Sequence, residues 1–152
     1  MSEQTELQIA DLDVASARGA IAGAVLHTPV VRCADVQRLA GTATVLKAEC
    51  LQTTGSFKLR GALNKLAALG DDARAGVVTA SAGNHGRALA YAACARGVPC
   101  DVFMPADAAV LKVAGIEELG ARVHTTGTSV DEALEQASAF ALRTGATFVH
   151  PF

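Results

Sequence analysis

The chain has 152 residues, of which 51% are hydrophobic, 18% charged and only 4% aromatic. Its length is close to that of a single average domain, with a core of alanine, valine and leucine. A formal net charge of −2 gives no reason to expect nucleic acid or an anionic membrane as a partner. The polar, acidic start is unlike a signal peptide, and the longest uncharged apolar stretch, 19–26, is far too short to span a bilayer. The sequence therefore predicts a cytoplasmic protein.

The first fifty residues predict one helix and two short strands. After a polar leader, the alanine-rich stretch 9–26 predicts a helix that ends at His27-Thr28-Pro29. Two strands are expected over 30–33 and 43–48, with a helical turn at 35–39 between them.

From residue 57 onward, helices and strands alternate regularly. Helices are expected over 57–69, 84–96, 108–119 and 130–143, and strands over 76–80, 100–104, 121–125 and 146–150. A glycine stands where each helix should end, at 70, 97, 120 and 145. Nearly uniform apolar strands such as Val77-Val78 suit a parallel sheet that is covered on both faces. The sequence thus predicts an α/β fold with an open parallel sheet and helices on both of its faces.

One lysine stands at the mouth of the helix expected over 57–69. Lys58 follows the loop 53–57, and the hydroxyl of Ser56 is expected to cap the helix. In the first turn the positive end of the helix dipole disfavours an ammonium, and partial burial acts in the same direction. A neutral amine near neutral pH is what a carbonyl cofactor needs to form a Schiff base. On position alone, however, a solvated surface lysine is the simpler interpretation.

A second motif, Ser81-Ala82-Gly83-Asn84-His85, joins an expected strand to an alanine-rich helix. Free backbone N–H groups at the start of that helix make an anion site, and Gly83 lets the backbone approach a ligand closely. In parallel sheets ligands bind beyond the carboxyl ends of the strands, where both motifs fall. A plain strand-to-helix turn capped by Ser81 or Asn84 is the alternative that composition alone favours.

Together the two motifs resemble those of pyridoxal-phosphate enzymes of the tryptophan-synthase-β type, known as fold type II. The resemblance runs from about His27 to Phe152, with a lysine motif over 47–62 and the loop 81–85 as its specific parts. Within that superfamily the chain is most similar to the N-terminal part of the threonine/serine dehydratases, or ammonia-lyases. The resemblance implies pyridoxal 5′-phosphate as the cofactor.

The resemblance also assigns roles to residues. Lys58 would form the Schiff base and act as general base, and Phe57 would contact the cofactor. Asn84 would donate a hydrogen bond to the phenolic oxygen of the cofactor. The substrate carboxylate would be held by the loop residues Ser81, Ala82, Gly83, Asn84 and His85. No metal site is expected, because the four cysteines, interpreted as buried thiols, form no C-x-x-C pair and none has a histidine at metal-ligand spacing.

The implied activity is β-elimination of water from L-threonine and L-serine, which yields 2-oxobutanoate or pyruvate plus ammonia. It would serve threonine catabolism or isoleucine biosynthesis, in a homo-oligomer when the chain is full length. Cysteine synthases differ at Phe57, Leu59 and His85, and threonine synthases usually carry aspartate where this chain has Leu59. Serine racemases use a loop serine as acid and base where this chain has Ala82. Another fold type II enzyme, such as a threonine synthase or a hydroxyaspartate dehydratase, and a non-catalytic truncated product stay open as alternatives.

The resemblance further places residues 1–50 largely in a larger, incomplete domain and residues 51–152 in a small α/β domain that carries both motifs. Similar enzymes are much longer, and later supply a glycine-rich loop for the cofactor phosphate and a Ser or Cys beside the pyridine nitrogen. We find neither in these 152 residues. We therefore expect these residues alone to bind the cofactor weakly and to turn over poorly, whether as a fragment or as a natural truncation.

Overall fold

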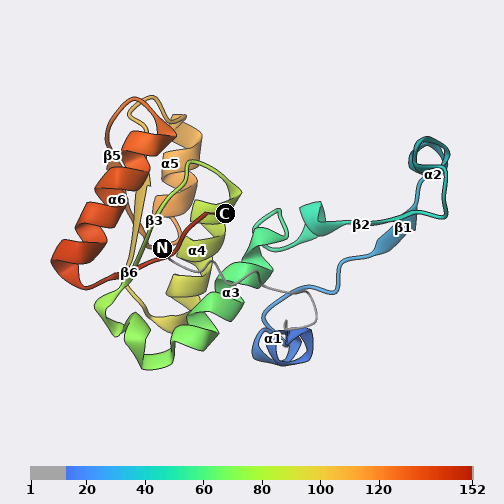
Figure 1. Ribbon diagram of the computed structural model, residues 1–152, viewed down its shortest axis with the longest axis horizontal. Helices are drawn as coiled ribbons and strands as arrows, with labels where there is room; N and C mark the ends of the chain where they lie inside the picture. Colours follow the sequence, from blue (N-terminus) through green and yellow to red (C-terminus); the bar gives the residue numbers. More distant parts are fainter. Residues whose placement is uncertain (1–12, 152) are drawn as a thin grey trace, which may run out of the picture.

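A four-stranded parallel sheet forms the main body of the computed structural model, which describes residues 13–151 (Figure 1). Its strands lie in the order β5-β4-β3-β6. They are β3 (Val77–Ala80), β4 (Cys100–Met104), β5 (Arg122–Thr125) and β6 (Thr147–Phe148). All three pairings are parallel, so the open parallel sheet predicted from the sequence is confirmed.

Helices cover both faces of this sheet (Figure 1). The larger core contains α3 (Lys58–Leu69), α4 (Asn84–Arg96) and α5 (Val110–Glu117), and α6 (Val130–Thr144) packs in a second core. Strand residues alternate between the two cores, because successive side chains point to opposite faces. Val77 and Val102 belong to the first core, whereas Val78 and Phe103 belong to the second. Both central strands, β3 and β4, are buried throughout, as expected for a sheet covered on both sides.

The part of the chain before α3 contains α1 (Val14–Ala20), β1 (Val30–Arg32), α2 (Ala34–Ala40), β2 (Val45–Lys47) and the 3-10 helix η2 (Glu49–Leu51); a second 3-10 helix, η3 (Gly70–Ala75), follows α3. Before α3, the chain runs from α1, which lies near α3, out to a part that contains β1 and β2 and extends away from this body (Figure 1). β1 and β2 pair with each other in antiparallel fashion and leave Val30, Val31 and Val45 exposed. The division into domains 1–50 and 51–152 stays a prediction.

Two predicted helices are longer than the helices that form. The helix predicted over 9–26 is present only as α1, since the chain turns after Ala20 and Gly23 adopts a φ of 78°. Residues 9–12 lie outside the described residues. The helix predicted over 108–119 is present as α5, over Val110–Glu117.

The predicted cap at Ser56 is wrong. Phe57 occupies the cap position of α3 and already has helical backbone angles, so Ser56 lies one residue too early to reach the first free N–H groups. The Ser56 hydroxyl is buried and has no hydrogen-bond partner within the part of the chain that the structure describes.

The expectation of buried thiols holds only in part. All four cysteines are free, but Cys50 and Cys94 are exposed and Cys33 is half-buried. Only Cys100 is buried, and its burial raises the pKa of the thiol to about 12. None of the described helices is both long and apolar enough to cross a membrane.

A carboxylate ties the loop before α3 to the segment before β1. Glu49 accepts hydrogen bonds from Arg60 Nε at 2.9 Å, from Arg60 Nη2 at 2.8 Å and from the hydroxyl of Thr28. The buried side chain of Gln52 bonds both backbone groups of Leu26, at 2.8 and 3.1 Å. We call Thr28, Glu49, Gln52 and Arg60 the Glu49 clamp. The bonds from Arg60, which outweigh the opposing effect of burial, hold the pKa of Glu49 at about 2.

We expect Glu49→Gln to lower the free energy of unfolding by about 2 kcal/mol at pH 7 because it removes the ion pair with Arg60. The pKa of Glu49 is depressed from 4.5 to about 2 in the folded chain. Its stabilisation is therefore present above pH 4.5 and is lost as the pH falls toward 2. Denaturant unfolding of both proteins at pH 7, pH 4 and pH 2.5 should show their difference shrinking.

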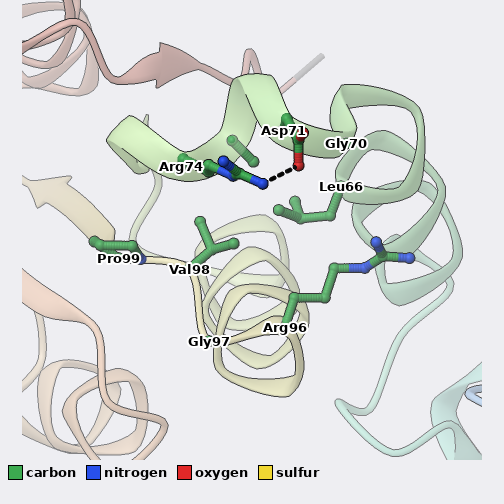
Figure 2. A pocket seen from close by; sticks show the side chains of 9 residues that line it. Leu66, Gly70, Asp71, Arg74, Arg96, Gly97, Val98 and Pro99 are labelled. Carbon is green, nitrogen blue, oxygen red and sulfur yellow. Dashed lines mark ion pairs between the residues drawn. The ribbon is translucent and has the colours of Figure 1, made fainter.

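Asp71→Asn is the matched control. The Asp71 carboxylate pairs with Arg74 at 2.9 Å, but the two side chains are 83% and 79% exposed. Figure 2 shows this pair beside a pocket of about 400 Å³ between the ends of α3 and α4. Because exposed ion pairs contribute little, the control should change stability far less than Glu49→Gln. An equal loss in both variants would contradict the importance of the Glu49 clamp.

Candidate active site

Lys58 lines a pocket of about 500 Å³ between α3 and the segment that follows β6. The pocket is lined on the α3 side by Phe57, Lys58, Gly61, Ala62 and Lys65, and elsewhere by His85 and residues 148–151. Its ionisable lining groups are two lysines and two histidines, and none of the described lining residues is acidic. The pocket therefore suits an anionic ligand.

The amine of Lys58 is held inside this pocket by the backbone. Lys58 is the first residue of α3 and is half-buried. Its Nζ donates a hydrogen bond of 2.7 Å to the carbonyl oxygen of Pro151, and lies 5.7 Å from the centroid of the Phe57 ring. The position at the helix mouth, predicted from the sequence, is confirmed, and Lys58 lines a pocket there.

His85 shares the pocket with Lys58. Its Nε2 lies 3.4 Å from the carbonyl oxygen of Val149, a long hydrogen bond. Burial lowers the pKa of His85; the bond to Val149 opposes this effect, and the charges of Lys58 and His150 add to it. The ring is therefore neutral at neutral pH.

The rest of the predicted loop lies elsewhere. Ala82, Gly83 and Asn84 line a second pocket, of about 270 Å³, together with Arg87 and residues of α5. Ser81 lines neither of these two pockets, and its hydroxyl accepts a bond of 3.2 Å from the N–H of Gly83. Among the predicted site residues, the structure thus brings together Phe57, Lys58 and His85 and places Ala82–Asn84 in the neighbouring pocket.

Sequence reasoning missed the close packing of Gly86. A Cβ on this residue would lie 2.6 Å from the carbonyl oxygen of Ser81, 3.1 Å from Val102 Cγ1 and 3.2 Å from Ile116 Cδ1. Because Gly86 has no Cβ, the first turn of α4 can pack closely against the loop and the sheet. The available signal was a glycine inside a helix, where it costs stability unless packing requires it.

The comparisons with known proteins identify the family. Residues 21–152 match the family model for pyridoxal-phosphate dependent enzymes. An L-threonine ammonia-lyase from Thermotoga maritima is 42% identical over 92% of this chain and 35% of its own length. A serine racemase from Oryza sativa subsp. indica is 38% identical over 91% of this chain and 41% of its own length.

A solved structure agrees with these relatives. A pyridoxal 5′-phosphate-dependent aspartate racemase superposes with a TM-score of 0.83 and 37% identity, over 98% of this chain and 46% of that one. The chain belongs to the pyridoxal-phosphate dependent enzymes, and its fold is that of fold type II. It spans less than half the length of the relatives reported above.

The pocket of Lys58 fits the cofactor of this family. It offers an amine for the carbonyl group, the rings of Phe57 and Phe148 for a planar aromatic ring, and positive charge at Lys65 for a phosphate. Two and four residues before Lys58, the hydroxyls of Ser56 and Thr54 are buried without a partner among the described residues. Buried hydroxyls usually have a hydrogen-bond partner, so these two hydroxyls at the start of α3 are available to bond a ligand. Nowhere in 13–151 is there a group of three or more His, Cys, Asp or Glu residues that could hold a metal ion.

Gly86→Ala should lower the free energy of unfolding by about 1–3 kcal/mol because the new Cβ would clash with backbone at Ser81. Thermal or denaturant unfolding followed by circular dichroism measures this loss. Gly115→Ala is the matched control: it also adds a methyl group inside a helix, but nothing lies within 4 Å of its Cβ. A Gly86→Ala variant as stable as Gly115→Ala would contradict the close approach.

Proposed function

We propose that the protein is a pyridoxal-phosphate dependent ammonia-lyase that eliminates water from L-threonine and L-serine. The products are 2-oxobutanoate or pyruvate, plus ammonia. The observation that carries this proposal is the Lys58 amine, which stands at a helix mouth in a pocket without an acidic lining residue among those described. The relatives named as a threonine ammonia-lyase and a serine racemase support amino acids of this size as substrates.

In this proposal Lys58 has two tasks. Its amine binds the carbonyl group of the cofactor, and after release it takes the proton from Cα of the substrate. When bound, the cofactor supplies a ring that accepts the electron pair left at Cα. No described residue of the pocket lining is acidic, so no carboxylate there competes with the cofactor for the Lys58 amine.

The loop 81–85 and the start of α4 would hold the substrate carboxylate. The cap residue of α4, Gly83, has no side chain that could bond the first N–H groups of this helix, so those groups are open to an anion. Asn84, carried over from the family motif, would bond the phenolic oxygen of the cofactor. Because it lines the pocket next to that of Lys58, its role stays a prediction.

The choice of elimination over racemisation rests on Ala82. A racemase needs a second proton-carrying group on the opposite face of the substrate, and the methyl group of Ala82 carries no such proton. We also retain the cytoplasmic location and the homo-oligomer as parts of the proposal. Racemisation is the second candidate, since a serine racemase and an aspartate racemase are among the similar proteins.

In a full-length enzyme that contains these residues, borohydride reduction in the presence of pyridoxal phosphate, followed by peptide mapping, should label Lys58. Lys58→Met should abolish both the label and ammonia release from threonine, because the variant has no amine at the helix mouth. Lys65→Met is the matched control: it removes the other lysine of this pocket and should weaken cofactor binding, but it keeps the Lys58 amine and should leave the label on Lys58. A label on Lys47, Lys65 or Lys112 in place of Lys58 would show that Lys58 is not the residue that binds the carbonyl group of the cofactor.

In the same full-length enzyme, Ala82→Ser should increase D-serine formation relative to ammonia release, because the new hydroxyl can carry a proton. Chiral chromatography of the product and an ammonia assay on the same samples measure the ratio. Ala82→Gly, which also changes the side chain but adds no hydroxyl, should not gain D-serine. Racemisation that rivals elimination before any substitution would show that another group supplies the proton and that Ala82 does not set the outcome.

A further inference from the structure

The segment after β6 is held by two side chains of the Lys58 pocket. The ladder between β3 and β6 ends at the pair Val78↔Phe148, followed by a bond of 2.8 Å from the N–H of Val149 to the Val78 carbonyl. Beyond that point His85 contacts the carbonyl of Val149 and Lys58 bonds the carbonyl of Pro151. The two carbonyls are two residues apart on one short strap, which we define as residues 149–151.

We propose that His85 is a positioning residue for Lys58, acting by fastening the strap 149–151 to α4. The Pro151 carbonyl oxygen, held in place by the strap, then accepts the hydrogen bond from Lys58 Nζ and fixes the position of the amine in the pocket. This proposal rests on the proposed function, in which that amine binds the cofactor.

The chemistry of His85 suits this role. Neutral imidazole donates one hydrogen bond, and Nε2 is the nitrogen that faces the Val149 carbonyl. The ionisable groups that line the pocket with it are Lys58 and Lys65 from α3 and His150 from the strap. A protonated ring would add a positive charge to a pocket that is already lined by two lysines. Burial lowers the pKa of His85, so the ring donates its bond without repelling the amine.

The placement of His85 also sets it apart from the rest of its motif. The three residues before it line the other pocket, whereas the ring of His85 lies on the Lys58 side. The ring serves the amine, and the backbone N–H of the same residue stays available at the start of α4.

The test compares two substitutions of His85 in the borohydride labelling experiment. The readout is the ratio of label on Lys58 to label on Lys65, with pyridoxal phosphate limiting. His85→Leu removes the donor and should lower this ratio about fivefold, the factor expected for the loss of one ordinary hydrogen bond. His85→Gln keeps a neutral donor and should stay within about twofold of the unsubstituted protein. His27→Gln, an exposed imidazole in another part of the fold, should leave the ratio unchanged.

Circular dichroism melting shows that each variant is folded; if His85→Leu does not fold, His85→Asn, whose amide is too short to reach Val149, takes its place. A ratio unchanged in the variant without a donor overturns the inference, and so does an equal fall in His85→Gln. Preferential label on Lys65 in the unsubstituted protein would instead refute the proposed function, so the two failures are distinguishable.

Discussion

The carboxylate of Glu49 joins two parts of the chain, and the place of Lys58 depends on that junction. Arg60 lies in the first turn of α3, so its two bonds to Glu49 fix the start of this helix against η2. Gln52 fixes the other end of the intervening loop to Leu26. The loop 53–57 is thus held at both ends, and the residue that follows it cannot shift without breaking a charged pair. Removing one partner of such a pair leaves the other charge poorly solvated, which makes the junction costly to open.

The parallel sheet sets the second constraint. Its strands end at one edge, where the loop 81–85 leads into α4, and Gly86 lets that helix approach the loop to within contact distance. The first turn of α4 then has a pocket on each side of it. Amine and imidazole lie on one side, and the small loop residues Ala82 and Gly83 lie on the other. This arrangement supports the proposal that the proton is moved on the Lys58 side and that the substrate carboxylate is bound by the loop on the other side.

Local sequence patterns predicted the helices and strands of the α/β body, but they did not predict the contacts between these elements. α3, α4 and α6 and the central strands lie within about a residue of their predicted bounds, because apolar periodicity and terminal glycines are local signals. The hydrogen bonds made by residues of the Glu49 clamp join residues 11, 21 and 26 positions apart, and no sequence periodicity indicates such pairs. The cap at Ser56 failed because Phe57 adopts helical angles, which the motif does not reveal. The separation of His85 from Asn84 follows from the turn of a helix, so adjacent letters of one motif face different pockets.

The sequence similarity of this chain to its relatives does not distinguish a lyase from a racemase. The threonine ammonia-lyase and the serine racemase are 42% and 38% identical to this chain, and one fold hosts both activities. The distinction has to come from groups that can carry a proton on each face of the substrate. On the Lys58 side the chain supplies an amine and an imidazole. The three loop residues that line the other pocket, Ala82, Gly83 and Asn84, have no side chain that titrates near neutral pH. Proton removal on one face without a loop donor on the other supports elimination as the proposed outcome.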